Sequence, residues 1–422
     1  MAKTRLASLD NPVETAVLVV INEDEADDMV VEEELEGLCE AAGVEPLTII
    51  RQRLDRPYKG TFIGSGKVEE IAVLAQDLKA DVVLIDGEVS GMQQRNLEEA
   101  FKTRVVDRTQ LILDIFARRA RTREGMLQVE LAQLTYMMPK LMSVYTKFER
   151  QKGGIGMRGP GETKLETDRR MVRDRIARLK EEIVDVKRVR DQQRASRRKH
   201  PFPFASIVGY TSAGKSTLMN RLAGTELLAD AMPFATLDPT TRKIDLPDGY
   251  ALFLTDTVGF IRNLPTHLVA AFQSTLEEVT HSDFILHLVD ISASAWDVQR
   301  DAVMETLDML GAQDKPCITV FNKIDSISDP AVRRELIAEF PNSVAISATT
   351  GEGIPDLLNA IKRQVQDLLG AIKALVPYSE SGLVQECYNF GRVLKIDYRD
   401  DGIYVEAELV KEMRGLLTKY AL

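Results

Sequence analysis

The sequence has few cysteines, few histidines and no long apolar run. Its 422 residues include 3 cysteines, Cys39, Cys317 and Cys387, which lack C-x-x-C spacing. We therefore expect reduced thiols, which are typical of a cytoplasmic protein. The 4 histidines lack metal-ligand spacing, so no histidine metal site is expected. The longest apolar stretches, such as AVLVVI, are far shorter than the roughly 18 residues of a membrane span, and the N-terminus resembles no signal peptide, so we expect neither membrane insertion nor a leader.

The composition predicts a folded protein of several domains with an uneven charge. Hydrophobic residues make up 44% and charged residues 28%, which excludes global disorder. The net charge is −11, yet residues 150–199 hold 17 Lys and Arg against 8 Asp and Glu, which leaves −20 for the rest of the chain. Such a run is often only a solvated helical face. In an acidic protein it also indicates a surface that contacts nucleic-acid phosphates.

Alternating apolar and amphipathic stretches predict an α/β fold in four parts. Residues 1–105 favour a small α/β domain with a largely parallel sheet. Residues 106–200 predict long basic helices, paired as a hairpin, around a glycine-rich loop at 153–162, GGIGMRGPGE. Residues 201–372 predict a second α/β unit, and residues 373–422 a small α+β domain with an Asp-Asp-Gly hairpin turn.

The stretch GYTSAGKS at 209–216 fits the phosphate-binding pattern G-x-x-x-x-G-K-[ST], between an apolar strand and a helix former. Its glycines let backbone N–H groups turn around phosphate oxygens at a helix N-terminus. Lys215 would contact the β- and γ-phosphates, and the Ser216 hydroxyl would bind Mg²⁺. The nucleotide contacts expected from this loop are Gly209, Tyr210, Thr211, Ser212, Ala213, Gly214, Lys215, Ser216 and Thr217.

Three further motifs end predicted strands, where open α/β sheets bind ligands. At Asp256-Thr-Val-Gly259, the carboxylate can hold a metal-bound water and the glycine N–H can point at a γ-phosphate. In Asn-Lys-Ile-Asp325, the carboxylate can accept from N1–H and the 2-amino group of guanine, which adenine lacks, so the motif selects guanine. We therefore predict a P-loop GTPase domain, with Lys215 and Gly259 as its catalytic residues. The contacts expected from these motifs are Asp256, Thr257, Val258, Gly259, Asn322, Lys323, Ile324, Asp325, Ser347, Ala348 and Thr349.

The sequence does not decide two features of the predicted GTPase domain, its second Mg²⁺ ligand and the role of Phe260. The segment PFATLDPTTRK at 233–243 should supply a second Mg²⁺ ligand, but spacing does not choose among Thr236, Thr240 and Thr241. Phe260 follows the Asp-Thr-Val-Gly turn, where GTPases of the Ras type carry a Gln that orients the attacking water. A phenyl ring cannot orient water. One interpretation is that the ring of Phe260 packs in the hydrophobic core. Whether or not it does, we expect the free protein to hydrolyse GTP slowly.

Together these motifs resemble the HflX family of translational GTPases. The resemblance rests on GYTSAGKSTLMN, FATLDPTTR, DTVGFIRNLP, NKID and SATTGEG, and in the first half on GTFIGSGKVEEI and KGGIGMRGPGETKLETDRR. It implies that Thr236 is the second magnesium ligand and that Phe234, Ala235, Leu237 and Asp238 adjoin the nucleotide. It also implies a Mg²⁺-dependent GTPase that binds the large ribosomal subunit and its rRNA, separates stalled ribosomes under stress and is stimulated by ribosomes. We expect a cytoplasmic monomer without a DNA partner.

Alternative interpretations remain for two parts of the chain. The stretch GTFIGSGK at 60–67 is either a second nucleotide site, for ATP as an example, or a structural βα turn or RNA-facing loop. The protein as a whole could instead be a signalling or scaffold GTPase whose helical half binds a protein, or an ATP-driven RNA remodeller that uses its N-terminal domain. Salt-dependent sedimentation with ribosomes would favour a ribosomal role over a protein-binding signalling or scaffold GTPase. Triphosphatase activity that persists without Lys215 would indicate an ATP-driven RNA remodeller.

Overall fold

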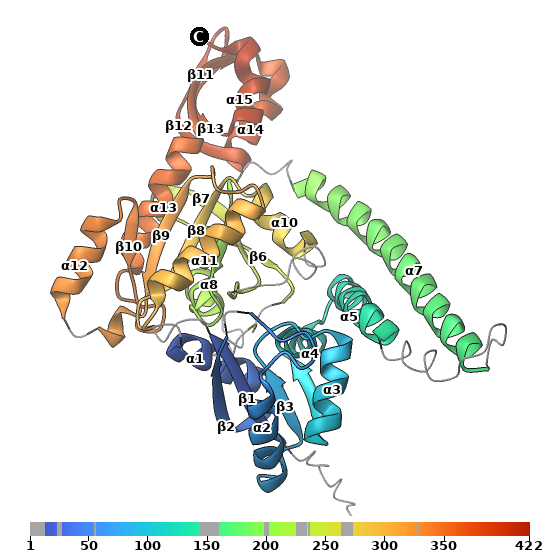
Figure 1. The fold of residues 1–422 in the computed structure, drawn as a ribbon. Helices are drawn as coiled ribbons and strands as arrows, with labels where there is room; N and C mark the ends of the chain where they lie inside the picture. The colour runs from blue at the N-terminus through green and yellow to red at the C-terminus, as the bar shows by residue number, and fades with distance from the viewer. Residues whose placement is uncertain are drawn as a thin grey trace, which may run out of the picture. The chain divides into compact units, whose positions relative to one another are not determined.

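The computed structural model describes residues 13–22, 28–54, 56–143, 160–197, 202–224, 234, 237–262, 273–327 and 329–422 (Figure 1). The chain divides into two compact units. The first comprises residues 1–118 and 129–179, and the second comprises residues 119–128 and 180–422. Both have the α/β architecture expected from the sequence. Within the ranges given above, no helix is long and apolar enough to span a membrane.

The first unit contains a parallel sheet of four strands in the order β2-β1-β3-β4, which confirms the parallel sheet expected from the sequence. Apolar side chains such as Val17 and Val83 pack against α2 and α3 through Ile71 and Leu97. Strand β4 and helix α4 continue this unit past residue 105. The elements are β1 (Glu14–Asn22), α1 (Asp28–Ala42), β2 (Val44–Arg53), α2 (Ser65–Asp77), β3 (Val82–Ile85), α3 (Gly91–Phe101), β4 (Arg104–Asp107) and α4 (Arg108–Arg119).

Side chains of α3 close the outer edge of β4. The Val105 N–H donates to Glu98 Oε1 at 3.2 Å, and the Val105 carbonyl accepts from Gln94 Nε2 at 2.9 Å. An edge strand with free backbone groups invites pairing with another chain. Glu98 and Gln94 therefore occupy the backbone N–H and carbonyl of Val105, which another strand would otherwise pair with.

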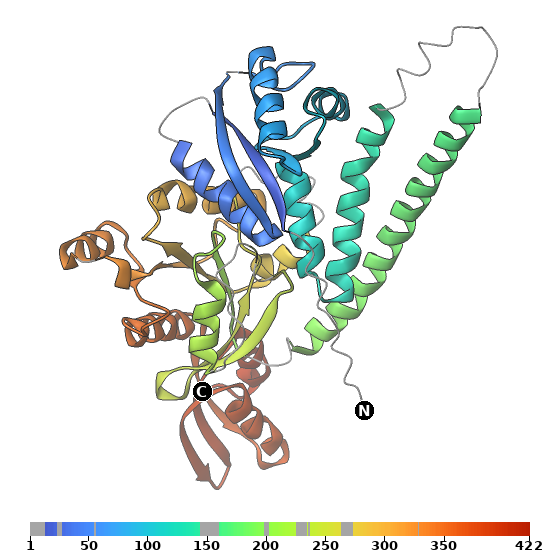
Figure 2. The same ribbon diagram turned by 90° about the horizontal axis from the view of Figure 1, so that it is seen from below.

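The helical segment differs in two places from the sequence-based prediction. The long helical stretch predicted before the glycine-rich loop is interrupted between α4 and α5 (Arg123–Ser143). Helix α7 (Pro160–Arg197) begins at a proline, a residue that suits the first turn of a helix. Residues 160–162, which were predicted as part of the loop, are therefore helical. Residues 153–159 of that loop lie outside the described ranges. In the first unit Arg175 of α7 forms a two-point ion pair with Glu130 of α5 at 2.7 Å, and Figure 2 shows both helices.

The second unit is built on a sheet of six strands in the order β10-β9-β8-β5-β7-β6, in which only β6 is antiparallel. The apolar runs SIVGY, ALFLTDT, FILHLVD, CITVFNK and SVAISAT predict five of these strands, whereas β6 has no such run. Its strands are β5 (Phe204–Gly209), β6 (Thr240–Asp245), β7 (Ala251–Asp256), β8 (Phe284–Asp290), β9 (Cys317–Asn322) and β10 (Ser343–Ala345). Its helices are α8 (Lys215–Ala223), α10 (Gln273–His281), α11 (Trp296–Met309), α12 (Pro330–Glu339) and α13 (Ile354–Leu368).

The C-terminal part of the second unit forms a small antiparallel sheet in the order β11-β13-β12. Arg399 pairs with Gly402, which confirms the hairpin predicted at Asp-Asp-Gly and leaves two residues in the turn between β12 and β13. Helices α14 and α15 pack on the sheet through buried residues such as Cys387 and Leu417. The strands are β11 (Gly370–Val376), β12 (Gly391–Arg399) and β13 (Gly402–Leu409), and the helices are α14 (Ser381–Phe390) and α15 (Lys411–Leu417). Strand β11 was not predicted.

Candidate active site

The predicted phosphate loop joins the end of β5 to the start of α8. Ser212 and Gly214 have φ values of 60° and 93°, in the left-handed region that glycine favours and that turns successive N–H groups inward. Lys215 is buried, and its Nζ donates to the carbonyls of Gly209 at 3.0 Å and Tyr210 at 2.7 Å. Burial lowers the pKa of Lys215 to about 8, while nearby Asp256 opposes the shift. A triphosphate would favour the charged ammonium at this position.

Ser216 and Asp256 form the part of the site that could hold a metal ion. The Ser216 hydroxyl donates to Asp256 Oδ2 at 2.7 Å, so the first turn of α8 and the end of β7 bring two oxygen donors together. Mg²⁺ prefers such hard oxygen donors and takes only one or two from protein, with waters and phosphates completing its shell. Among the described residues no group of three or more His, Cys, Asp or Glu could hold a metal. The two oxygen donors of Ser216 and Asp256 fit an Mg²⁺ ion that is bound together with a nucleotide.

The Asp-Thr-Val-Gly turn lies directly against the phosphate loop. A Cβ placed on Gly259 would be 3.0 Å from Thr211 Cα and 3.1 Å from Lys215 Nζ, so only glycine fits without displacing the loop. Thr257 is fully buried and its hydroxyl donates to the Ile207 carbonyl at 2.7 Å. These contacts hold the Asp-Thr-Val-Gly turn against the phosphate loop.

Asn322 connects the predicted guanine motif to two other loops. Its Nδ2 donates to the Ala213 carbonyl at 2.8 Å, and its Oδ1 accepts from the Ala348 N–H at 2.9 Å. Lys323 has a left-handed φ of 65°, and its Nζ pairs with Asp290 at the end of β8. Asp325 lies in a short 3-10 turn (Ile324–Ser326) and is exposed, so its carboxylate is accessible to a base.

Arg221 of α8 is a site residue that sequence analysis missed. Its Nε donates to the Ala348 carbonyl at 2.9 Å, and its Nη2 donates to the Thr349 carbonyl. These bonds fix the Ser-Ala-Thr loop to the helix that follows the phosphate loop. No local motif signals such a role, because the partners are far away in the chain.

Two of the three candidate threonines, Thr240 and Thr241, lie in the described part of the chain, at the start of β6. The hydroxyls of Thr241 and Thr255 are 2.9 Å apart, so Thr241 is engaged within the sheet. Thr240 begins β6 and is paired with Asp256 in the ladder. Ala235 and Thr236 lie outside the described ranges, whereas the neighbouring Phe234 and Leu237 are both 2% exposed.

The loop at 60–67 is held by contacts within the first unit. The ring of Phe62 is 8% exposed, and a Cβ on Gly87 would be 2.5 Å from it. The Gly60 carbonyl accepts from Asn96 at 2.7 Å, and the Gly64 N–H donates to Gln52 at 3.0 Å. These contacts favour a structural βα turn over a second phosphate cradle.

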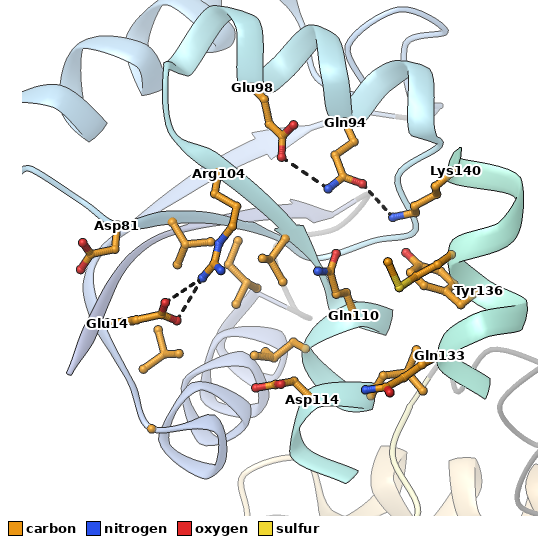
Figure 3. A pocket seen from close by; sticks show the side chains of 18 of the residues that line it. Glu14, Asp81, Gln94, Glu98, Arg104, Gln110, Asp114, Gln133, Tyr136 and Lys140 are labelled. Carbon is orange, nitrogen blue, oxygen red and sulfur yellow. Dashed lines mark hydrogen bonds and ion pairs between the residues drawn. The ribbon is translucent and has the colours of Figure 1, made fainter. Parts of the chain in front are cut away.

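The first unit also contains a cavity of about 1370 Å³ beside β3, β4 and α5 (Figure 3). Its charged lining is balanced, and Glu14 and Arg104 neutralise each other through two contacts of 3.0 Å. The acids are Glu14, Asp81, Glu98 and Asp114, and the bases are Arg95, Arg104, Arg118 and Lys140. This balance gives no preference for the several negative charges of a nucleotide.

A mostly parallel sheet, a phosphate loop and a guanine motif at its carboxyl ends define a P-loop GTPase. The chain matches the family models described as "GTP-binding GTPase N-terminal" over residues 31–117, "GTP-binding GTPase Middle Region" over 119–197 and "50S ribosome-binding GTPase" over 204–323.

Relatives match over nearly the whole chain. "GTPase HflX" of Lacrimispora saccharolytica is 47% identical over 99% of both chains. "GTPase HflX" of Escherichia coli is 44% identical over 92% of both. The solved structure of the "SsGBP and GDP complex" is 26% identical, covers 84% of this chain and 99% of its own, and has a TM-score of 0.49. The chain belongs to the HflX family of GTPases, as the sequence motifs indicated.

Proposed function

We propose that this GTPase binds the large ribosomal subunit through rRNA and separates stalled ribosomes under stress. The domain of residues 204–323 matches a model described as a 50S ribosome-binding GTPase, which supports a ribosomal partner. The protein would act in the cytoplasm as a monomer, without a DNA partner.

The observation that carries the proposal is the set of exposed basic residues on α7. Some basic side chains of this helix are used internally, since Arg175 pairs with Glu130 and Arg190 with Glu124 and Glu277. Lys187 and Arg188 are exposed but pair with Glu277 and Asp185. Other exposed basic residues are Arg170, Arg173, Arg178 and Lys180. Arginine and lysine contacts to phosphates supply most of the sequence-independent affinity for nucleic acid. Arg158 and the side chain of Lys164, in the same basic segment of the sequence, lie outside the described ranges.

Mg²⁺ would be held by Ser216 and Thr236, with Asp256 acting through a bound water. When bound, the ion neutralises charge that develops on the β- and γ-phosphate oxygens. Lys215 would bind the same phosphates, and the Gly259 N–H would donate to the γ-phosphate. Phe260 supplies no group that could orient the attacking water, so that group must come from elsewhere in the chain or from a partner, and in this proposal the ribosome supplies it.

The test is sedimentation of the full chain with large subunits and whole ribosomes in GTP, GDP and a slowly hydrolysed GTP analogue. Binding with the analogue, together with conversion of whole ribosomes to subunits in a sucrose gradient, is the expected result. Absence of binding in all three states would overturn the proposal and favour a protein partner. Triphosphatase activity that survives Lys215→Ala would instead indicate a second nucleotide site.

A further inference from the structure

The turn that carries Asp325 is held at both ends by one arginine. This turn is the 3-10 segment Ile324–Ser326, and it ends at Ile327. Nη2 of Arg333, in α12, donates to the Ile324 carbonyl at 2.6 Å and to the Ile327 carbonyl at 3.3 Å. One of these carbonyls precedes Asp325 in the chain and the other follows it. The guanidinium therefore fixes the backbone on both sides of the carboxylate.

The same guanidinium also reaches the Ser-Ala-Thr loop. Its Nη1 pairs with Glu352 Oε1 at 2.6 Å, and Glu352 belongs to the SATTGEG stretch that begins at Ser347. The Glu352 carbonyl accepts from the Ser347 N–H at 2.9 Å, so the backbone of Glu352 helps to shape that loop. A guanidinium can bridge the two because its donors point in fixed, separate directions. Arg333 thus joins the Asn-Lys-Ile-Asp turn to the Ser-Ala-Thr loop.

Packing of α12 keeps Arg333 at this position. Leu336, one turn further along the helix, is 7% exposed and lies in one buried cluster with Ile324, which is 2% exposed. The helix begins with a cap in which Asp329 accepts from the Ala331 N–H at 2.8 Å. The Arg333 side chain is 24% exposed, so its contacts are partly shielded from water. Hydrogen bonds from a charged donor are stronger than neutral ones. The bridge is therefore held in place by both packing and charge.

Asp325 depends on its backbone for its orientation. The residue is exposed, so packing does little to direct its side chain. A two-point contact with the N1–H and 2-amino group of guanine requires the carboxylate to face the edge of the base. A turn that is fixed beforehand loses less conformational entropy when the base binds. The contacts of Arg333 supply this fixation.

We infer that Arg333 is a positioning residue for guanine specificity, which keeps the Asp325 carboxylate directed at both donors of the base. The inference rests on the proposed role of Asp325 as the residue that recognises guanine. Hypoxanthine provides the probe, because it has the N1–H and 6-oxo group of guanine and lacks the 2-amino group. The preference for a guanine over a hypoxanthine nucleotide therefore measures the second bond of the carboxylate.

Calorimetry of the full chain with GDP and with inosine diphosphate measures this preference without hydrolysis of a triphosphate. In the parent, GDP should bind about tenfold to a hundredfold more tightly, as expected for a hydrogen bond to a charged group. Arg333→Ala should reduce this preference by about threefold to tenfold, within the usual range for residues joined in one hydrogen-bond network. Arg334→Ala is the matched control, because it makes the same change at the adjacent, exposed position of α12 and should keep the parental preference.

Three further variants test the same bridge. Arg333→Lys keeps the charge and the helix, but one ammonium cannot reproduce the fork of donors, so the preference should lie between those of Arg333→Ala and the parent. Glu352→Ala leaves Arg333 bonded to the turn and should lower the preference less than Arg333→Ala does. In the Asp325→Asn background, Arg333→Ala should cause no further loss of preference, since both changes act through one contact.

Equal losses of affinity for the two nucleotides in Arg333→Ala would overturn the inference, because general loosening of the site does not distinguish the bases. An unchanged preference in both Arg333→Ala and Arg333→Lys would overturn it as well. Asp325→Asn separates the two ideas. If it leaves the preference unchanged, the assignment of Asp325 is wrong and the inference falls with it. If it lowers the preference and the Arg333 variants do not, only the role of Arg333 is wrong.

Discussion

The backbone N–H of Phe260 donates to the Gly209 carbonyl at 3.1 Å, and the Phe260 carbonyl accepts from the Thr211 N–H at 2.8 Å. The residue after the Asp-Thr-Val-Gly turn is thus paired with the phosphate loop itself. Its side chain is 2% exposed, which confirms the interpretation that the ring packs as core. A structural residue therefore stands where GTPases of the Ras type place a water-orienting Gln.

Replacement of this ring should affect stability more than chemistry. Phe260→Ala should lower the free energy of unfolding by about 3–5 kcal/mol, because it leaves a cavity in the core. Phe260→Gln should not accelerate hydrolysis, since its amide would point into the same buried space. Urea unfolding and single-turnover assays measure both effects, with Tyr398→Ala, at 70% exposure, as a control that should unfold like the parent. Faster hydrolysis by Phe260→Gln would show that this position faces the attacking water.

Asp325→Asn tests the guanine reader. The amide donor would oppose the donors of guanine, so GTP affinity should fall by about two to four orders of magnitude, or ~3–5 kcal/mol. Xanthine nucleotides carry a carbonyl at position 2 and should be tolerated better. Asp329→Asn is the matched control, because Asp329 caps α12 through Ala331 at 2.8 Å and asparagine caps equally well. Equal GTP affinity in Asp325→Asn and the parent would refute the assignment.

The depressed pKa of Lys215 predicts proton uptake on nucleotide binding. In the free protein the pKa is about 8, so at roughly pH 9 most Lys215 side chains are neutral. Bound phosphates favour the ammonium and raise the pKa, so binding at that pH takes up a proton and affinity falls as pH rises above 8. Calorimetry in two buffers of different ionisation enthalpy measures the uptake. It should vanish at about pH 7 and in Lys215→Met, and proton-neutral binding near pH 9 would contradict the prediction.

The exposed face of α7 should account for part of the salt dependence of ribosome binding. Arg170→Ala with Arg173→Ala should weaken sedimentation with large subunits and reduce the salt slope by somewhat under one unit per lost contact. GTP affinity should not change, because neither residue belongs to the nucleotide site. Arg334→Ala removes an exposed charge from α12 and serves as the control. If the double variant binds with the parental affinity and slope, α7 does not face phosphates.

The nucleotide motifs could be predicted because the residues that each one requires lie next to one another in the sequence. The phosphate loop, for example, needs glycine at the left-handed Gly214 and a lysine directly after it, and both are visible in one octapeptide. The parallel strands are apolar on both faces and were also evident. Strand β6, TTRKID, consists mostly of polar residues, so no apolar run in the sequence indicated a strand there. Strand β11, GAIKALV, directly follows α13 and was not separated from it.

The break between α4 and α5 had only one local signal, the N-cap residue Thr122, whose hydroxyl accepts from the Gly125 N–H at 3.0 Å. The sequence ARRARTRE around it contains neither proline nor glycine. Thr122, whose hydroxyl caps the new helix, is held by Asp238, which lies 116 positions further along the chain. The role of Asn322 in joining the Ala213 and Ala348 loops is equally non-local. Single-sequence reasoning finds motifs that bind a ligand and misses the contacts that join them.

Single-turnover GTP hydrolysis by the full chain, with and without saturating large ribosomal subunits, tests the central claim most directly. The claim is that the site is complete except for the positioning of water, which Phe260 cannot provide. The free protein should therefore hydrolyse GTP slowly, and the subunits should raise the rate by about tenfold or more. Rapid hydrolysis by the free protein, or a rate that ribosomal subunits do not change, would show that the water is positioned within the chain and would contradict this account.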